Sequence, residues 1–253
     1  MSQPLLQVSH LAKRFEGIVA TDDLVLDVEP GELHAVIGPN GAGKTTLILQ
    51  LSGQLTSDSG RVVFAGTDIT AMPMYRRTAL GLARSFQITS LFLDLSVLDN
   101  VALAVQAHAG HSFHFWRDAR REPELREPAR ALLARVGLTE RTDRPASTLS
   151  HGEHRQLELA MALAGEPRML LLDEPMAGLG PEESARMVEM LRALKREVTI
   201  MLVEHDMEAV FALADRITVL VYGRVVATGT PEDIRANAQV REAYLGEQEA
   251  GNV

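Results

Sequence analysis

Residues 38–45 read Gly-Pro-Asn-Gly-Ala-Gly-Lys-Thr, which is a glycine, four free positions and then Gly-Lys-Thr. Such a loop is typical of polyphosphate binding, because its glycines let the backbone approach a phosphate and turn N–H groups toward it. Lys44 would reach the β and γ phosphates, and Thr45 would bind Mg²⁺. The predicted binding loop comprises Gly38, Pro39, Asn40, Gly41, Ala42, Gly43, Lys44, Thr45 and Thr46.

The segments on either side of this loop support the interpretation. Residues 32–37 form a short apolar run of strand type, and a helix is expected from Lys44 to about Leu51. The start of that helix adds a positive dipole end, which favours a bound phosphate. A simple turn followed by a solvated lysine is the alternative, but the order strand, glycine loop, helix favours a phosphate site.

Composition excludes several classes of protein. The 253 residues are 46% hydrophobic, enough for one large domain with a buried core. A formal net charge of −9 disfavours a broad surface for nucleic acid or an anionic membrane, but not a local phosphate pocket. The absence of cysteine excludes disulfides, thiolate chemistry and cysteine-based zinc sites, and it fits a reducing cytosol.

Membrane-crossing segments are not expected either. Residues 1–7 lack the basic and apolar parts of a secretory signal, and no apolar run approaches the roughly 20 residues that span a bilayer. If the protein works at a membrane, other chains must cross it.

Strands are expected on both sides of the phosphate loop. Leu5–Val8 and Leu24–Val28 would pair as an antiparallel layer joined by a polar turn from Lys13 to Thr21. Phe15 falls in that turn, where its ring would either stack on an adenine or plug a sheet edge. After the loop helix, Asp58-Ser59-Gly60 reads as a turn into a strand at Arg61–Ala65.

The middle of the chain changes from strands to helices. A short helix near Pro73–Ala79 is followed by Gly81–Gln87, which predicts a buried strand ending on a glutamine that would hold a Mg²⁺-bound water or simply be solvated. Residues 89–165 then carry alanines and leucines at helical spacing, which indicates an inserted helical subdomain. His108, His111 and His114 recur there every third residue, but their glycine and aromatic neighbours favour an irregular surface over a metal site.

A helix is expected to begin at Ser150-His151-Gly152-Glu153 and to run to Ala164. Ser150 and Glu153 have the spacing of a capping box, in which each side chain bonds the other residue's N–H. The same helix start, with its serine hydroxyl and its glycine, would also suit a phosphate. Both interpretations follow from the residues.

Two apolar runs end in charged residues. Met169–Asp173 is typical of a buried parallel strand and is followed directly by Glu174. Ligands of doubly wound sheets bind beyond the carboxyl ends of strands, so Asp173 would reach Mg²⁺ and Glu174 would address an attacking water. Val198–Val203 is a second such strand, after which His205 would contact a γ phosphate, although a lone histidine is more often structural.

The last part of the chain predicts a helix, a hairpin and a second helix. Pro181 begins the first helix, in which Val188, Leu191 and Leu194 would face inward. Residues 217–227 predict a hairpin through Gly223, and Thr230 would cap the helix that follows.

In their order and spacing, these motifs resemble the ATP-binding subunit of an ABC transporter over nearly the whole chain. Residues 38–45 look like the Walker A loop, Gln87 the Q-loop, residues 149–153 the signature, residues 169–174 the Walker B strand with its glutamate, and His205 the switch histidine. Phe15 matches the aromatic residue that stacks on adenine. The resemblance implies an α/β P-loop ATPase with a mainly parallel core sheet, an N-terminal antiparallel β layer and the inserted helical subdomain; residues 1–246 would form this domain and 247–253 a flexible tail.

The sequence is especially similar to the ATP-binding subunits of branched-chain amino-acid importers of the Liv type. The matching stretches are Gly-Leu-Ala-Arg-Ser-Phe-Gln at 81–87, Leu-Asp-Glu-Pro-Met-Ala-Gly-Leu at 172–179, Glu-His-Asp-Met at 204–207 and Ala-Tyr-Leu-Gly at 243–246. Importers for urea and short amides look similar. Two departures stand out: the signature has His151 for a glycine and Glu153 for a glutamine, and Gly180 stands where many relatives have aspartate.

The resemblance implies a mechanism shared by two subunits. Two copies, or this chain and a homologous one, would close head to tail, with ATP between the loop of one and Ser150, Gly152 and Glu153 of the other. Thr45, Gln87 and Asp173 would serve Mg²⁺, with Glu174, His205 and Gln87 as the catalytic residues.

The same resemblance implies the partners. These would be membrane permease subunits, contacting the surface around Gln87 and residues 113–116, and indirectly a periplasmic or extracellular solute-binding protein. The subunit would sit peripherally on the cytoplasmic face of the inner membrane. A soluble ABC ATPase acting on ribosomes or DNA, and a nucleotide-binding regulatory module with little turnover, are the alternatives; the chain lacks the second nucleotide domain or coiled-coil insert common in the former, and Glu174 and His205 argue against the latter.

Overall fold

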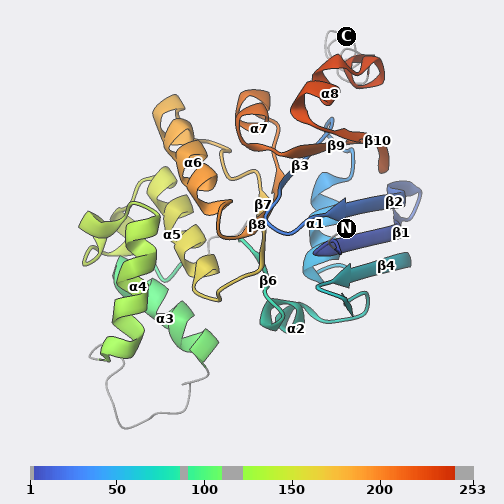
Figure 1. The fold of residues 1–253 in the computed structure, drawn as a ribbon. Helices are drawn as coiled ribbons and strands as arrows, with labels where there is room; N and C mark the ends of the chain where they lie inside the picture. The colour runs from blue at the N-terminus through green and yellow to red at the C-terminus, as the bar shows by residue number, and fades with distance from the viewer. Residues whose placement is uncertain (1–2, 86–90, 110–121, 243–253) are drawn as a thin grey trace.

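The computed structural model describes residues 3–85, 91–109 and 122–242, and it consists of two sheets flanked by helices (Figure 1). The central six-stranded sheet has the order β10-β9-β3-β8-β7-β6, and in it β10 alone runs antiparallel to its neighbour. The second sheet is four-stranded and antiparallel, with the order β2-β1-β4-β5. The structure therefore confirms the mainly parallel core and the N-terminal antiparallel layer.

The strands of the antiparallel sheet are β1 (Leu6–Phe15), β2 (Ile18–Val28), β4 (Ser59–Phe64) and β5 (Thr67–Asp68). The strands of the central sheet are β3 (Leu33–Ile37), β6 (Leu82–Arg84), β7 (Met169–Asp173), β8 (Thr199–Val203), β9 (Arg216–Val221) and β10 (Arg224–Gly229). The α-helices are α1 (Lys44–Ser52), α2 (Met74–Ala79), α3 (Val97–Ala109), α4 (Pro123–Arg135), α5 (His151–Leu163), α6 (Pro181–Leu194), α7 (Met207–Leu213) and α8 (Pro231–Ala236). Two 3₁₀ turns, η2 (Thr139–Arg141) and η3 (Ala146–Thr148), precede α5.

The central strands are buried on both faces, which explains their unbroken apolar sequence. Successive side chains of a strand point to opposite faces. In β7, Met169 and Leu171 belong to the core shared with the antiparallel sheet, whereas Leu170 and Leu172 belong to the core beneath the helical layer. Asp173 follows at the carboxyl end of the same strand.

Helix α1 lies between the two sheets, where Leu47, Ile48 and Leu51 are fully buried. This position places the helix start, and with it the phosphate loop, at the carboxyl end of β3. The sequence order strand, glycine loop, helix is confirmed.

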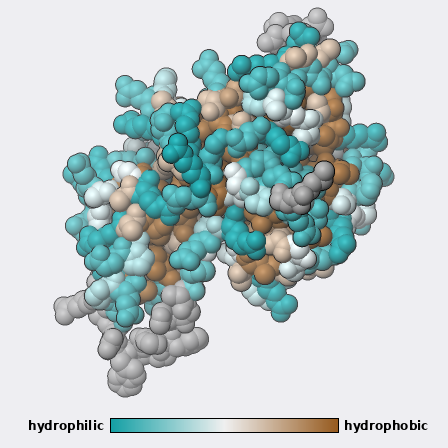
Figure 2. All heavy atoms as spheres, viewed as in Figure 1, coloured by the Kyte–Doolittle hydropathy of each residue, from teal (hydrophilic) through white to brown (hydrophobic). Residues whose placement is uncertain are grey.

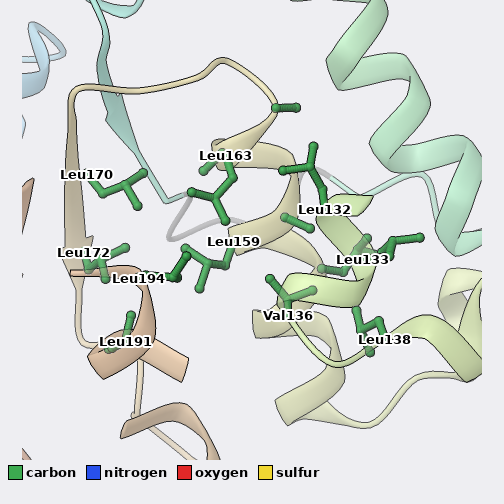
Figure 3. Close-up of a cluster of buried hydrophobic side chains, with 14 of the residues drawn as sticks. Leu132, Leu133, Val136, Leu138, Leu159, Leu163, Leu170, Leu172, Leu191 and Leu194 are labelled. Atoms are coloured by element: carbon green, nitrogen blue, oxygen red, sulfur yellow. The ribbon is translucent and has the colours of Figure 1, made fainter. Parts of the chain in front are cut away.

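The opposite face of the sheet is covered by leucines from α5 and α6, and leucines of α4 join the same core next to α5 (Figure 3). In that view Leu159 and Leu163 of α5 and Leu191 of α6 lie close to Leu170 and Leu172 of β7. The described elements between β6 and β7 are helices and 3₁₀ turns, as predicted for the inserted subdomain. The bounds 89–165 and the tail at 247–253 stay predictions, and the tail falls in a range that the structure leaves undescribed.

The predicted polar turn from Lys13 to Thr21 is wrong. β1 extends to Phe15 and β2 begins at Ile18, and Lys13 pairs with Thr21 across the two strands. Many of these residues are exposed on a two-stranded extension, so their polarity reflects solvent rather than a turn.

One smaller prediction also needs correction. Ser59 and Gly60 lie in β4 rather than in a turn, at a register shift where Gly60 has φ of 95°. The inward stripe of α6 is confirmed, since Leu191 and Leu194 are buried and Val188 is partly buried against the same core, which Met187 also joins.

The surface agrees with the composition. Figure 2 shows hydrophilic residues over most of one face, with hydrophobic residues visible in patches between them. Across the three described ranges, none of the helices combines the length and hydrophobicity that crossing a bilayer requires.

Candidate active site

The glycines of residues 38–43 hold the loop against neighbouring strands. Gly43 has φ of 99°, and a Cβ there would lie 2.0 Å from the carbonyl oxygen of Ala20 in β2. At Gly38, a Cβ would lie 2.1 Å from the carbonyl oxygen of Leu220 in β9. No real side chain fits at either distance, so both positions require glycine.

The start of α1 is open toward an anion. Gly43 is the N-cap, no side chain caps the helix, and its first turn contains no acidic residue. The first N–H groups of a helix have no partner within it, and the dipole is positive there. Lys44 is buried, and its Nζ donates to the carbonyl oxygens of Gly38 at 2.6 Å and Pro39 at 2.9 Å. A cation and a set of N–H groups thus face the same loop.

Asp173 lies at the end of β7 with only 5% of its surface exposed. Its Oδ2 accepts a hydrogen bond from Nη2 of Arg84 at 3.1 Å, while its buried Oδ1 has no hydrogen-bond partner. Burial raises the pKa of Asp173 above its ordinary value, although the nearby Arg84 and Lys44 charges oppose this. The phosphate loop and the end of β7 therefore meet, as the sequence predicted.

The donor set fits Mg²⁺ with a nucleotide. A buried carboxylate oxygen without a partner is what a hard cation would satisfy, and Thr45 carries an exposed hydroxyl at the start of α1. Within the described ranges, no cluster of three or more His, Cys, Asp or Glu residues could hold a metal.

Glu174 adopts a left-handed backbone with φ of 49°, which few residues other than glycine tolerate. Its N–H donates to the carbonyl oxygen of Val203 in β8 at 2.8 Å, and its side chain is 41% exposed. Nδ1 of His205 lies 3.9 Å from Oε1 of Glu174. Glu174 and His205, two of the three predicted catalytic residues, are therefore neighbours, and both side chains are open to solvent.

Glu204 fixes the segment that carries His205. It is fully buried, and its carboxylate accepts hydrogen bonds from the backbone N–H groups of Met176, His205 and Asp206. The N–H of Met176 belongs to the segment that follows Glu174. Glu204 thus ties the two segments that carry Glu174 and His205 together.

The start of α5 differs from that of α1, because it is capped by its own side chains. The Ser150 Oγ accepts from the N–H of Glu153 at 3.2 Å, and the Ser150 N–H donates to Oε2 of Glu153 at 2.8 Å, which confirms the capping box. Arg141 donates to the other oxygen of Glu153 at 2.7 Å. Burial alone would raise the pKa of Glu153, but these two bonds hold it below its ordinary value.

The predicted residues form two groups. The phosphate loop, Asp173, Glu174 and His205 lie around the carboxyl ends of β3, β7 and β8, whereas Ser150, Gly152 and Glu153 lie on α5. In Figure 1, α5 and α1 lie on opposite sides of these strands. Among the described residues, no hydrogen bond or ion pair joins the two groups.

Three other predictions have separate outcomes. Phe15 is the last residue of β1, 45% exposed, with Nζ of Lys13 5.6 Å from its ring centre, so the ring is available for stacking. Gln87 lies outside the described residues. The same holds for His111 and His114, whereas His108 is in the last turn of α3.

Sequence reasoning missed the roles of Arg84 and Glu204. Arg84 stands in the stretch 81–87 and Glu204 directly before His205, but neither sequence pattern assigns these residues a role. An arginine at the end of β6, beside a strand ending in aspartate, was the available signal for the first contact. A carboxylate at the end of a fully buried strand was the signal for the second.

Comparisons with known proteins agree with this geometry. The family "ABC transporter" matches residues 21–177, and the family "Branched-chain amino acid ATP-binding cassette transporter" matches residues 224–250. BraF of Pseudomonas aeruginosa, a high-affinity branched-chain amino acid transport ATP-binding protein, is 40% identical over 98% of this chain and 100% of its own length. LivG of Escherichia coli, which has the same description, is 38% identical over the same shares.

Solved structures give the same result. A nucleotide-free ATP-binding cassette from an ABC transporter superposes with a TM-score of 0.84 at 28% identity, covering 96% of this chain and 99% of that one. An ATP-binding cassette in its ADP conformation superposes with a TM-score of 0.85 at 29% identity, covering 97% and 100%.

Proposed function

The chain belongs to the ABC transporter family as an ATP-binding cassette, and from this premise we propose that it hydrolyses ATP to power a binding-protein-dependent importer of branched-chain amino acids. One observation carries the proposal: Lys44 of the glycine loop lies near Asp173, whose Oδ1 is buried without a hydrogen-bond partner. The match of residues 224–250 and the names of the relatives support branched-chain amino acids as the solute class.

The nucleotide would be held mainly by the phosphate loop. The N–H groups at the start of α1 and the Lys44 ammonium would neutralise the β and γ phosphates, and Phe15 would stack on the adenine. Phosphoryl transfer depends chiefly on positioning and charge neutralisation, which these groups supply without covalent chemistry.

The metal would lie between the loop and β7. Thr45 and the unpartnered Oδ1 of Asp173 would hold it, together with Gln87. Mg²⁺, when bound, supplies charge neutralisation at the phosphate oxygens.

The hydrolytic step would be carried by Glu174. Its exposed carboxylate would orient and deprotonate the attacking water, and His205, 3.9 Å away, would contact the γ phosphate. Glu204 would keep the backbone of both segments in place. A second subunit would supply Ser150, Gly152 and Glu153 from the other side, since these residues lie apart from the loop in one chain.

A groove offers a docking surface for the permease. A cavity of about 430 Å³ lies between α2, β6, α3 and α5, and its wall includes Met74, Tyr75, Arg84 and Ala104. Met74 and Tyr75 are 41% and 66% exposed, so the groove presents two neighbouring apolar side chains to a partner. We assign this groove to the cytoplasmic loops of the membrane subunits.

In this arrangement the subunit sits peripherally on the cytoplasmic face of the inner membrane. Its pairing with a second ATP-binding subunit, identical or homologous, completes both nucleotide sites. The solute-binding protein acts from the other side of the membrane, so selectivity resides in other chains.

The test is to purify the chain with its native membrane subunits and to measure phosphate release in proteoliposomes. The native solute-binding protein is added with leucine, isoleucine, valine, urea or a short amide. Acceleration by a branched-chain amino acid, and not by urea or amides, is the expected result. Acceleration by urea or an amide alone would move the chain to the related importers, and turnover without any membrane partner or response would favour a soluble ABC ATPase.

A further inference from the structure

An acidic side chain lies over the start of α5, where an anion would bind. Oε1 of Glu183, from the first turn of α6, accepts a hydrogen bond from the Ser150 Oγ at 3.3 Å. A Cβ added to Gly152 would lie 2.7 Å from the same oxygen. The carboxylate therefore covers both residues that distinguish this helix start.

From this geometry we propose that Glu183 occupies the place of a γ phosphate at the start of α5, and that ATP held by a second copy of the chain must displace it when two subunits close. The proposal rests on the proposed function, because it concerns the residues that complete the second subunit's site. It adds a residue that sets how readily that site closes.

The hold on Glu183 is weak enough for displacement. Its bond to Ser150 is long at 3.3 Å, and its other oxygen accepts from the Gly180 N–H at 3.4 Å, at or beyond the usual limit for such bonds. The positive ends of α5 and α6 both favour a negative charge there. Glu183 is thus attracted by two helix starts without a strong bond to either.

The surroundings offer the displaced carboxylate a new partner. Ser150, Gly152, Glu183 and Arg186 line one cavity of about 370 Å³. Arg186 stands one turn after Glu183 on α6, and no hydrogen bond or ion pair engages its side chain within the described ranges. A pair three residues apart on a helix is within reach, so Glu183 would turn from Ser150 to Arg186.

Charge and space both prevent a phosphate and the Glu183 carboxylate from occupying the start of α5 at the same time. A phosphate oxygen bonded to the Ser150 Oγ or the Gly152 N–H would come within van der Waals distance of the Glu183 carboxylate. Two negative charges about 4 Å apart repel strongly wherever solvent is partly excluded. Neutralising Glu183 should therefore favour closure without changing nucleotide binding by a single subunit.

The experiment uses the slow-hydrolysing Glu174→Gln chain and measures its ATP-driven self-association by light scattering. Glu183→Gln in that background keeps the shape and the hydrogen-bonding oxygen but removes the charge. It should lower the ATP concentration for half-maximal association by about tenfold, from the size of like-charge repulsion at this separation. The matched control is Glu182→Gln, which removes the same charge from an exposed neighbouring side chain and should change nothing.

A second variant guards against a folding defect. Glu183→Asp keeps the charge but draws it back from Gly152, and it should lie between the parent and Glu183→Gln. Equal association of the Glu183→Gln and Glu182→Gln chains, or weaker association of the former with an unchanged melting temperature, overturns the proposal. A parent chain that binds ATP but never self-associates overturns this inference, because it excludes pairing between two copies, and it leaves pairing with a homologous subunit as the head-to-tail arrangement.

Discussion

The starts of α1 and α5, where we propose that phosphates bind, are built in opposite ways. The start of α1 has a glycine N-cap, no side-chain cap and no acid in its first turn, and Lys44 adds a positive charge. The start of α5 is closed by Ser150 and Glu153, and Glu183 lies over it. The first is ready for a phosphate, whereas the second already holds a carboxylate.

Under the proposed function, this difference explains how one chain would bind ATP alone and yet require a partner for turnover. An open helix start with a buried lysine gives affinity without rearrangement. A helix start satisfied by its own side chains adds affinity only when another charge replaces them. Closure of two subunits is then a distinct, adjustable step, separate from nucleotide binding.

Glu174→Gln separates the two steps most sharply. Loss of the carboxylate that activates water should lower steady-state hydrolysis by about 1,000-fold, within the usual range for a general base. We call the phosphate loop and the start of α1 the open half of the site, and the start of α5 the closed half. Binding of ATP to the open half should be unchanged, because no loop residue is altered. Phosphate release and a titration with a fluorescent ATP analogue measure the two quantities, and unchanged turnover would remove Glu174 from the base role.

Lys44→Ala breaks the open half itself. Without the ammonium that faces the β and γ phosphates, ATP affinity should fall by about 100-fold, as expected for loss of charge-assisted bonds. Lys195→Ala is a suitable control, since Lys195 pairs with Asp215 at a distance from the loop. Equal affinity of the two variants would contradict the phosphate-loop assignment.

Gly43→Ala tests whether the loop is held by the strands behind it. Both Gly43 and Gly41 have left-handed backbones, with φ of 99° and 76°, but only at Gly43 does an added Cβ meet another atom, Ala20 O at 2.0 Å. Gly43→Ala should therefore lower the free energy of unfolding by about 2 kcal/mol more than Gly41→Ala does. Urea unfolding gives both values, and equal losses would show that the clash relaxes freely.

Much of the open half was predictable from sequence, because its contacts are local or follow from sheet geometry. The loop spans nine residues, and the rule that ligands bind beyond parallel strand ends brought Lys44 and Asp173 together. The buried run Met169–Leu172 likewise indicated a central strand, since only two covered faces explain four consecutive apolar residues.

The long-range contacts of the site were not predictable in the same way. Arg84 and Asp173 are 89 residues apart, and Ser150 and Glu183 are 33 apart, so no spacing rule joins them. Their meeting depends on how the helices pack on the sheet. The lengths of β1 and β2 were missed for a different reason: a solvent-exposed hairpin has the polar composition of a turn.

The substitution Glu153→Gln restores the glutamine that the resembling signature usually has at this position. Of the variants considered, it should have the smallest effect, and it tests the start of α5. The lowered pKa of Glu153 means that its carboxylate stabilises the fold above its ordinary unfolded pKa, and that this contribution is lost as pH falls through the folded value. The variant should therefore be less stable than the parent by roughly 0.5 kcal/mol at neutral pH, and the difference should disappear once the pH has fallen below the lowered folded pKa of Glu153. Urea unfolding across pH, with the exposed Glu140→Gln as control, measures it; a difference that persists in acid would mean that Arg141 and the Ser150 N–H act on Glu153 through packing rather than charge.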